Sequence, residues 1–297
     1  MTITPDQWTK AQREGWLCKL YATCNADGIR ALPPGFVLSQ LLDALEDLLS
    51  YKLSPEDTAT RSASLILSEI DVSTPWTNVV GMVLDAATTF NDEKILITLI
   101  DYLVELASLP DAINKGPGVK TIDVGGGEIW QIQPDQAIVF AEGKLWRDLP
   151  TYSWNVTENF QGLIAGPELW LHCLSAPATP LAAMQAWRNL NTYLALMAVH
   201  PKAQTVPALA GKARLGLTTL GLALENSPGT RRGKVSELHA PAAAQWLRVA
   251  GDEIERLCEE ETEQIMAGDL WKCRGGTDMC NSARMAFWKS RLMEMGY

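Results

Sequence analysis

The stretch AAAQWLRVAGDEIERLC, residues 242–258, indicates the fold class of the chain. Its apolar side chains recur at i, i+3, i+4 and i+7, the spacing of one face of a helix. These side chains are Ala243, Trp246, Leu247, Ala250, Ile254, Leu257 and Cys258. The charged residues fall on the opposite face, so the stretch predicts an amphipathic helix that packs on an apolar core.

A second helix is predicted over residues 37–49, VLSQLLDALEDLL, where leucines recur with the same period. Capping residues followed by proline mark where other helices begin. Thr4-Pro5-Asp6-Gln7 has the pattern of a capping box, in which two side chains satisfy free backbone N–H groups. Ser54-Pro55 and Thr74-Pro75 repeat the cap-and-proline pattern. The N-terminal third of the chain is therefore predicted to be helical.

Two segments, residues 94–107 and 181–199, are apolar on nearly every side of a helix. A helix without a polar face belongs inside a large fold rather than at its surface. We therefore expect both helices to lie centrally, with amphipathic helices around them.

Residues 110–166 interrupt the helical pattern with many Gly and Pro residues, including the triplet Gly125-Gly126-Gly127. Within this segment, residues 129–132 and 137–140 are compatible with strands and equally with short helical turns. Because the segment is apolar and aromatic, unlike a linker, we predict one all-α domain over residues 1–297. This domain should have about ten to twelve helices, with residues 110–166 as an irregular insert.

The composition argues against several classes of protein. A net charge of −10 provides no basic surface to attract nucleic acid. The N-terminal residues lack a basic start followed by an apolar run, so we expect no secretory signal. No stretch approaches the roughly 18 apolar residues of a membrane span, and we expect a cytoplasmic location. The six cysteines are then expected to be thiols, and the Asn155-Val156-Thr157 sequon unmodified.

The motifs of cofactor and metal chemistry are missing from the sequence. The glycine triplet has neither the G-x-G-x-x-G spacing nor a following Lys-Ser/Thr, so it predicts a turn rather than a phosphate site. The sequence contains no C-x-x-C, no H-E-x-x-H and no G-x-S-x-G. We therefore expect no cofactor and no metal.

Tryptophan is unusually frequent, at 11 of 297 residues, against 3 histidines. Each Trp supplies a large apolar surface and one N–H donor. The excess suits tight packing between helices, and it also suits an apolar pocket that holds a flat or polycyclic ligand. The predicted walls of such a pocket are Trp146, Trp154, Trp187 and Trp246.

Four polar residues are candidates for chemistry in that pocket. Asn191 lies on an apolar stripe, where it is either a hydrogen-bonded link between helices or a polar handle for a ligand. Glu225 ends an apolar run and is either an acid in apolar surroundings or the partner of an arginine. Asp148 either accepts backbone N–H groups ahead of Pro150 or acts as an acid or base. Tyr152 is, with Asn191, a candidate hydrogen-bond donor.

Six motifs follow one another along the second half of the chain. They are LWRDLPTYSWNVTENF, AWRNLNTYLALM, LGLALE, PAAAQWLRVAG, GDLWKC and MAFWKSRLMEM. Over residues 145–295 they resemble a family of fungal proteins known only as a domain of unknown function. The closing motif departs from the family pattern, with Met285 and Leu292 where the family usually has aromatic residues. The resemblance implies a helical cytosolic protein and small-molecule chemistry, without an established activity.

Together with the aromatic residues, the resemblance favours a cofactor-independent cyclase or isomerase of fungal secondary metabolism. Its aromatic-lined pocket would fold an apolar small molecule while one or two polar groups polarise a carbonyl or move a proton. The alternative is a non-catalytic helical interaction or scaffold protein. A third interpretation, a thiol enzyme, would use Cys273, which Lys272 and Arg274 flank. The oligomeric state is open, and a homodimer is compatible with the sequence.

Overall fold

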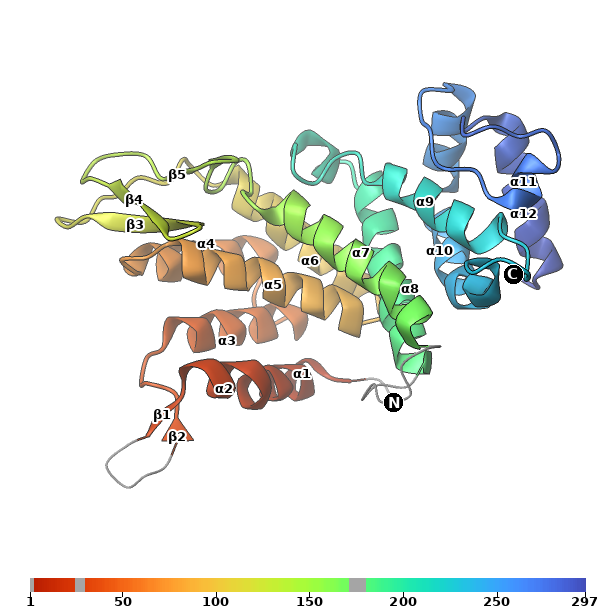
Figure 1. Ribbon diagram of the computed structural model, residues 1–297. Coiled ribbons are helices and arrows are strands. Elements are labelled where there is room, and N and C mark those ends of the chain that lie inside the picture. The colour runs from red at the N-terminus through yellow and green to blue at the C-terminus, as the bar shows by residue number, and fades with distance from the viewer. Residues whose placement is uncertain (1–2, 25–29, 171–179) are drawn as a thin grey trace. The chain divides into compact units, whose positions relative to one another are not determined.

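A computed structural model of the chain, shown in Figure 1, describes residues 3–24, 30–170 and 180–297. Helices dominate this fold, and the strands of the described residues form only short antiparallel pairs. The predicted all-α class is therefore confirmed. The α-helices are α1 (Pro5–Gln12), α2 (Cys18–Tyr21), α3 (Val37–Leu49), α4 (Pro55–Ser68), α5 (Ser73–Thr89), α6 (Glu93–Ser108), α7 (Tyr152–Trp170), α8 (Pro180–Val199), α9 (Ala213–Leu224), α10 (Ser236–Glu259), α11 (Asp269–Lys272) and α12 (Ser282–Glu294).

Two of the three predicted caps, Thr4 and Ser54, begin helices of the N-terminal region. At α1, the Thr4 hydroxyl accepts from the Gln7 N–H at 3.3 Å and the Gln7 side chain accepts from the Thr4 N–H at 3.0 Å. At α4, the Ser54 hydroxyl accepts from the Asp57 N–H at 3.0 Å. Helix α3 spans the predicted residues 37–49. Side-chain caps thus set the starts of α1 and α4, as the sequence predicted. The third predicted cap, Thr74, lies inside α5, which begins at Ser73.

The chain divides into two compact units. The first unit comprises Met1–Ala86 and Thr98–Asn155, and the second comprises Ala87–Ile97 and Val156–Tyr297. Because α5, α6 and α7 each contribute residues to both units, neither unit is a continuous piece of chain.

In the first unit, large aromatic side chains fill the core between helices. Trp8, Trp76 and Tyr102 are at most 1% exposed. Their polar atoms are paired, because the Trp76 indole N–H donates to the Pro150 carbonyl at 2.9 Å and the Tyr102 hydroxyl donates to the Ser62 hydroxyl at 2.9 Å. Such pairing avoids the cost of burying a polar group without a partner.

The glycine triplet forms the turn of a β-hairpin. Strand β3 (Lys120–Gly125) pairs with β4 (Glu128–Ile132), and β5 (Val139–Phe140) pairs with β6 (Gly143–Lys144). The triplet has φ values of +88°, +65° and +85°, a region that other residues rarely adopt. A third pair joins β1 (Thr23–Cys24) to β2 (Arg30–Ala31). The predicted irregular insert therefore contains short strands over part of its length.

Helix α7 begins at Tyr152, inside the segment that the sequence predicted to be irregular up to residue 166. The stretch YSWNVTENF mixes aromatic, β-branched and amide residues, which are weak helix formers and have no clear helical period. The irregular backbone lies just before it, where Leu149 and Thr151 have φ values of +42° and +66°. The amide of the sequon residue Asn155 donates to the Thr151 carbonyl at 2.9 Å and so continues this turn into the helix.

In the second unit, α10 packs against both α8 and α9. The middle of α8 is buried, as its apolar pattern predicted, whereas Leu181 and Val199 near its ends are 73% and 43% exposed. Gly216 of α9 allows the close approach of α10, because a Cβ there would lie 2.7 Å from the Trp246 ring. The backbone of α10 is non-helical at Ala250, so the predicted helix over residues 242–258 is in fact kinked.

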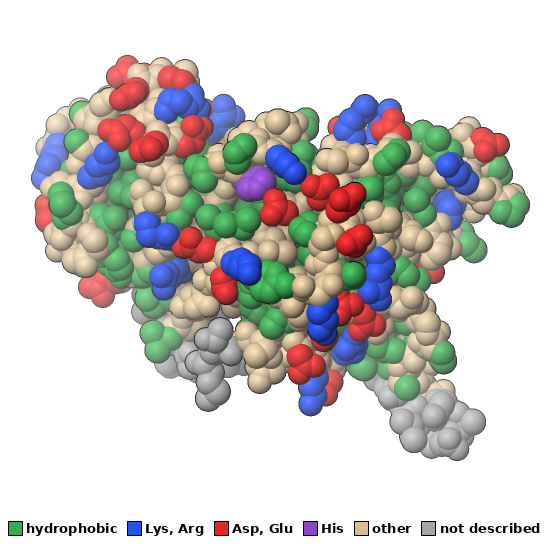
Figure 2. Space-filling model, turned by 180° about the vertical axis from the view of Figure 1, so that it is seen from behind, with side chains coloured by type: hydrophobic (Ala, Val, Ile, Leu, Met, Phe, Trp, Pro, Cys, Tyr) green, Lys and Arg blue, Asp and Glu red, His purple; other side chains and the backbone are tan. Residues whose placement is uncertain are grey.

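None of the helices among the described residues is both long enough and apolar enough to cross a membrane. On the face shown in Figure 2, acidic and basic side chains are interspersed, and no extended basic patch gathers there. This distribution agrees with the excess of acidic over basic residues, 35 against 25.

Candidate functional site

The structure places the predicted site residues in two groups. Trp146, Asp148, Tyr152 and Trp154 belong to the first unit, and Trp187, Asn191, Glu225 and Trp246 belong to the second.

Asn191 of α8 lies at the centre of a fully buried polar cluster. Its Oδ1 accepts from the Trp246 indole N–H of α10 at 2.6 Å and from the Thr219 hydroxyl of α9 at 2.7 Å. Its Nδ2 donates to the Trp187 carbonyl at 2.8 Å. The amide thus ties three helices together, which corresponds to the link between helices that the sequence allowed.

Trp187 and Trp246 are both buried in the core of the second unit, at 0% exposed. The Trp187 ring packs at 4.9 Å from the Phe160 ring and edge-on at 5.9 Å from the His239 ring. These are the geometries that aromatic pairs prefer. The indole N–H of Trp187 has no acceptor among the described residues, whereas that of Trp246 has Asn191.

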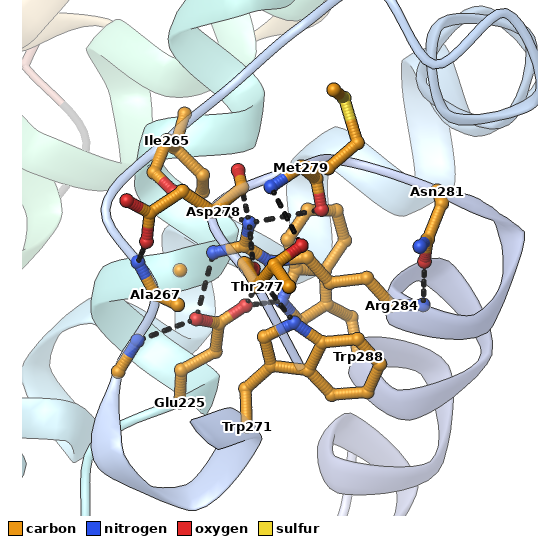
Figure 3. Close-up of polar contacts among 12 residues, drawn as sticks. Glu225, Ile265, Ala267, Trp271, Thr277, Asp278, Met279, Asn281, Arg284 and Trp288 are labelled. Atoms are coloured by element: carbon orange, nitrogen blue, oxygen red, sulfur yellow. Dashed lines mark hydrogen bonds and ion pairs between the residues drawn. The ribbon is translucent and has the colours of Figure 1, made fainter. Parts of the chain in front are cut away.

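Glu225, at the C-terminal end of α9, is paired with an arginine inside the second unit, as Figure 3 shows. Its Oε1 accepts from Arg284 Nε and from the Trp288 indole N–H, both at 2.6 Å. Its Oε2 accepts from Arg284 Nη2 at 2.9 Å and from the Gly268 N–H at 2.8 Å. Both side chains of the ion pair are 0% exposed. Both oxygens of the Glu225 carboxylate therefore accept hydrogen bonds from the protein itself.

The other end of the Arg284 guanidinium binds backbone carbonyls of one loop (Figure 3). Its Nη1 donates to carbonyl oxygens at 2.8–3.3 Å, those of Ile265, Thr277, Asp278 and Met279. The Arg284 guanidinium carbon also lies 5.4 Å from the centre of the Trp288 ring. Because one buried arginine joins the end of α9, the loop and α12, this cluster fixes the C-terminal part of the second unit.

In the first unit, Asp148 binds the backbone of its own turn. Its Oδ2 accepts from the Lys144 N–H at 2.7 Å. Gly143 approaches it so closely that a Cβ there would lie 2.4 Å from Asp148 Oδ2. Tyr152 is fully buried at the start of α7, while Trp154 is 64% exposed and lies at the surface. None of Asp148, Tyr152 and Trp154 lines the 580 Å³ cavity of the first unit.

A cavity of about 580 Å³ lies within the first unit and is partly open to solvent. Its walls come from the C-terminal part of α4 with the residues that follow it, from residues 109–120, and from Trp146. Asn114 shapes the second wall, because its buried amide donates to the Gly118 carbonyl at 2.8 Å and the Ile132 carbonyl at 3.0 Å. This volume is large enough for a small organic ligand.

Trp146 is the one predicted pocket wall that lines this cavity. The side chain is only 2% exposed, and its ring packs edge-on at 6.0 Å from the Trp76 ring. Unlike Trp76, Trp146 donates its indole N–H to none of the described residues. A free N–H donor on the wall of a cavity is available to a ligand that carries an acceptor.

Charged groups also lie along this cavity. Asp111 is exposed and pairs with Lys144, and the hydrogen bond from Lys144 holds the pKa of the Asp111 carboxyl below its ordinary value. Lys120 Nζ donates to the Leu67 and Glu69 carbonyls, both at 2.7 Å, and so caps the end of α4. Lys115 forms no ion pair with any described residue.

Metal ligands and thiols are the remaining candidates for chemistry among the described residues. No cluster of three or more potential metal ligands occurs among them. Their cysteines, Cys18, Cys24, Cys258, Cys273 and Cys280, form no disulfide, and Cys173 lies outside the described residues. Cys273 is exposed, and the neighbouring Arg274 guanidinium stacks at 4.9 Å from the Phe287 ring.

Two elements of these sites were not singled out by the sequence. Arg284 was not assigned as the partner of Glu225, although Asn281 precedes it as a helix cap and its N–H donates to Asn281 Oδ1 at 2.9 Å. The cavity wall at residues 109–120 carries only a glycine–proline signal, Gly116-Pro117-Gly118, that is also typical of any loop.

The fold and the site together define a mainly helical protein with an apolar cavity and without a recognisable catalytic motif. The chain belongs to the family described as Protein of unknown function (DUF3632), whose model matches residues 76–292. The expected membership of an uncharacterised family is thereby confirmed. Neither the search of curated proteins nor that of solved structures found a match. The matched range includes Trp146, Asn191, Glu225 and Arg284 but begins after α4.

Proposed function

We propose that this protein binds an apolar small molecule that carries a hydrogen-bond acceptor, in the first-unit cavity between α4 and residues 109–120. The observation that carries the proposal is the indole N–H of Trp146, a residue of the cavity wall, because this donor has no acceptor among the described residues. Ligand pockets typically combine apolar walls with a few polar groups that orient the ligand. An ether or carbonyl oxygen on the ligand would accept a hydrogen bond from the Trp146 N–H.

The rim of the cavity supports this choice of ligand. Ile70, Ile113 and Val119 line it and are 70%, 39% and 38% exposed. Burial of such side chains contributes roughly 25 cal/mol per Å² of apolar surface removed from water. A ligand with an apolar body would therefore gain free energy from the rim and orientation from Trp146.

A narrower proposal is that the bound molecule is cyclised or isomerised without a cofactor, in secondary metabolism of the fungal kind. Asp111 is the acidic side chain on the cavity wall, and its carboxylate would be the group that accepts a proton from a bound ligand. A ligand that binds should then be converted into a product of equal mass but different chromatographic retention. Recovery of the ligand unchanged after prolonged incubation with stoichiometric protein would limit the function to binding.

A second candidate function, that of an interaction or scaffold protein, is supported by the β3–β4 hairpin. Ile129 and Trp130 of β4 are 61% and 36% exposed. Exposed apolar side chains on a hairpin can pair with a partner, including a second copy of the chain. Light scattering of the purified protein at increasing concentration distinguishes a homodimer from a monomer, and the Trp130→Ser variant should weaken a dimer formed through this hairpin.

Replacement of Trp146 by phenylalanine tests the orienting hydrogen bond. We expect affinity for a ligand with an acceptor to fall about 2- to 12-fold, since a neutral hydrogen bond contributes about 0.5–1.5 kcal/mol. Ligands are first found by a thermal-shift screen of polycyclic and terpenoid ketones, and affinities are then measured by calorimetry. The control is the corresponding hydrocarbon, whose affinity should change less. An equal loss for ketone and hydrocarbon would show that Trp146 contributes packing alone.

A further inference from the structure

A second cavity, of about 490 Å³, lies within the second unit. One wall is α9 at Thr218, Gly221 and Leu222, and the others are residues 226–232 and residues 264–269. None of these residues was a candidate in the sequence, and the proposed function does not use them. The whole cavity falls within the range matched by the family model, residues 76–292.

The walls of this second cavity are held by the buried ion pair of Glu225 and Arg284. The Gly268 N–H donates to Glu225 Oε2 at 2.8 Å, and the Leu270 N–H donates to the Glu225 carbonyl at 3.0 Å. Arg284 binds the Ile265 carbonyl on the same loop at 3.2 Å. A site held by such contacts is preorganised, so a ligand does not have to order the loop when it binds.

Glycines allow the walls to approach closely and leave room inside. A Cβ on Gly268 would lie 2.2 Å from the Glu225 carbonyl oxygen, and one on Gly221 would lie 2.8 Å from the Ile265 side chain. The floor is apolar, since Leu222, Ile265 and Ala267 line it. The cavity is therefore shaped to take an apolar body against α9.

The two charged side chains that line the cavity, Asp269 and Arg232, differ in whether they have a partner. The Asp269 carboxylate accepts from the Ser227 N–H at 2.9 Å, and hydrogen bonds from Ser227 hold its pKa below the ordinary value. By contrast, Arg232 is exposed and forms no ion pair with a described residue. The side chains of Thr218 and Gln264 likewise make no hydrogen bond to the described residues. The free groups of the cavity are thus one cation and neutral hydrogen-bonding side chains.

We propose that this second cavity binds an organic carboxylate with an apolar body, with Arg232 as the counter-ion. The guanidinium fork matches the two oxygens of a carboxylate, while the floor at Leu222 and Ile265 covers the apolar part. The site is separate from the first-unit cavity, whose free donors are the Trp146 indole N–H and the Lys115 ammonium. A protein with a net charge of −10 does not attract anions in general, so binding must come from this local cation.

The test uses the full-length protein with octanoate and 1-naphthoate as probes, and with the matching amides as uncharged controls. Calorimetry should show that wild type binds a carboxylate more tightly than its amide. The Arg232→Gln variant should lose about 10- to 100-fold in carboxylate affinity, because hydrogen bonds to charged groups are worth about 1.5–3 kcal/mol. Its affinity for the amides should stay the same.

The Arg231→Gln variant is the matched control, because it removes the same charge from the neighbouring residue, which does not line the cavity. It should bind both carboxylates like wild type. A Thr60→Trp variant, altered in the first-unit cavity, should also retain carboxylate binding, which separates this proposal from the proposed function. The proposal is overturned if wild type binds neither carboxylate at millimolar concentration, or if the Arg232 and Arg231 variants lose equal affinity.

Discussion

Replacement of Arg284 by methionine is expected to lower the free energy of unfolding by about 3–5 kcal/mol, the usual cost of leaving a buried charge unpaired. The variant removes both hydrogen bonds from the guanidinium to Glu225 and leaves that carboxylate at 0% exposed. It also leaves the carbonyls of the 265–279 loop without their shared donor. Urea denaturation followed by circular dichroism measures the effect.

Two companion variants distinguish the effect of losing the buried ion pair from the effect of losing a large side chain. Replacing Arg256 by methionine should cost much less, because its ion pairs with Glu253 and Glu260 are on the surface, with the arginine side chain 49% exposed. Combining Arg284→Met with Glu225→Gln removes both charges and should restore part of the lost stability. If Arg284→Met is no more destabilising than Arg256→Met, the buried pair does not hold the C-terminal region.

Replacement of Asn191 by leucine should lower the free energy of unfolding by about 1–3 kcal/mol, because it leaves the buried Trp246 N–H without an acceptor. The Thr219 hydroxyl keeps a second acceptor, the Leu215 carbonyl at 3.2 Å, so Trp246 should account for most of the loss. The same denaturation assay measures it.

A double-mutant cycle with Trp246→Phe isolates this hydrogen bond. The phenylalanine substitution should cost less stability when Asn191→Leu is already present, because the indole donor has then lost its partner. Strictly additive effects of the two substitutions would contradict the assigned role of Asn191 as a hydrogen-bonded link between α8, α9 and α10.

Local signals explain why much of the fold could be predicted. Helix α3 follows from the leucine period of residues 37–49, and the start of α1 follows from a capping box that involves only Thr4 and Gln7. These contacts join residues a few positions apart, so a short stretch of sequence contains the whole interaction. The onset of α7 was missed because its first turns carry weak helix formers and are held by backbone contacts at Leu149 and Thr151.

The candidate sites depend on contacts that no local pattern reveals. Asn191 binds residues 28 and 55 positions away, and Glu225 binds Arg284 at a separation of 59. The type of partner could be anticipated, since a buried carboxylate needs a donor, but its position could not. The first-unit cavity similarly combines α4 with residues 109–120, which share no motif. Of the four predicted tryptophan walls, Trp187 and Trp246 are core residues, Trp154 is exposed, and Trp146 lines that cavity.

The central claim is that the first-unit cavity is a ligand site, and a matched pair of variants on α4 tests it most directly. Thr60 and Ser64 are both exposed, but only Thr60 lines the cavity. Calorimetric titration of the best ligand from the screen should show at least a 10-fold loss of affinity in Thr60→Trp, because the indole occupies ligand space, and no change in Ser64→Trp. Unchanged binding by Thr60→Trp, with both variants folded like wild type, would contradict the claim.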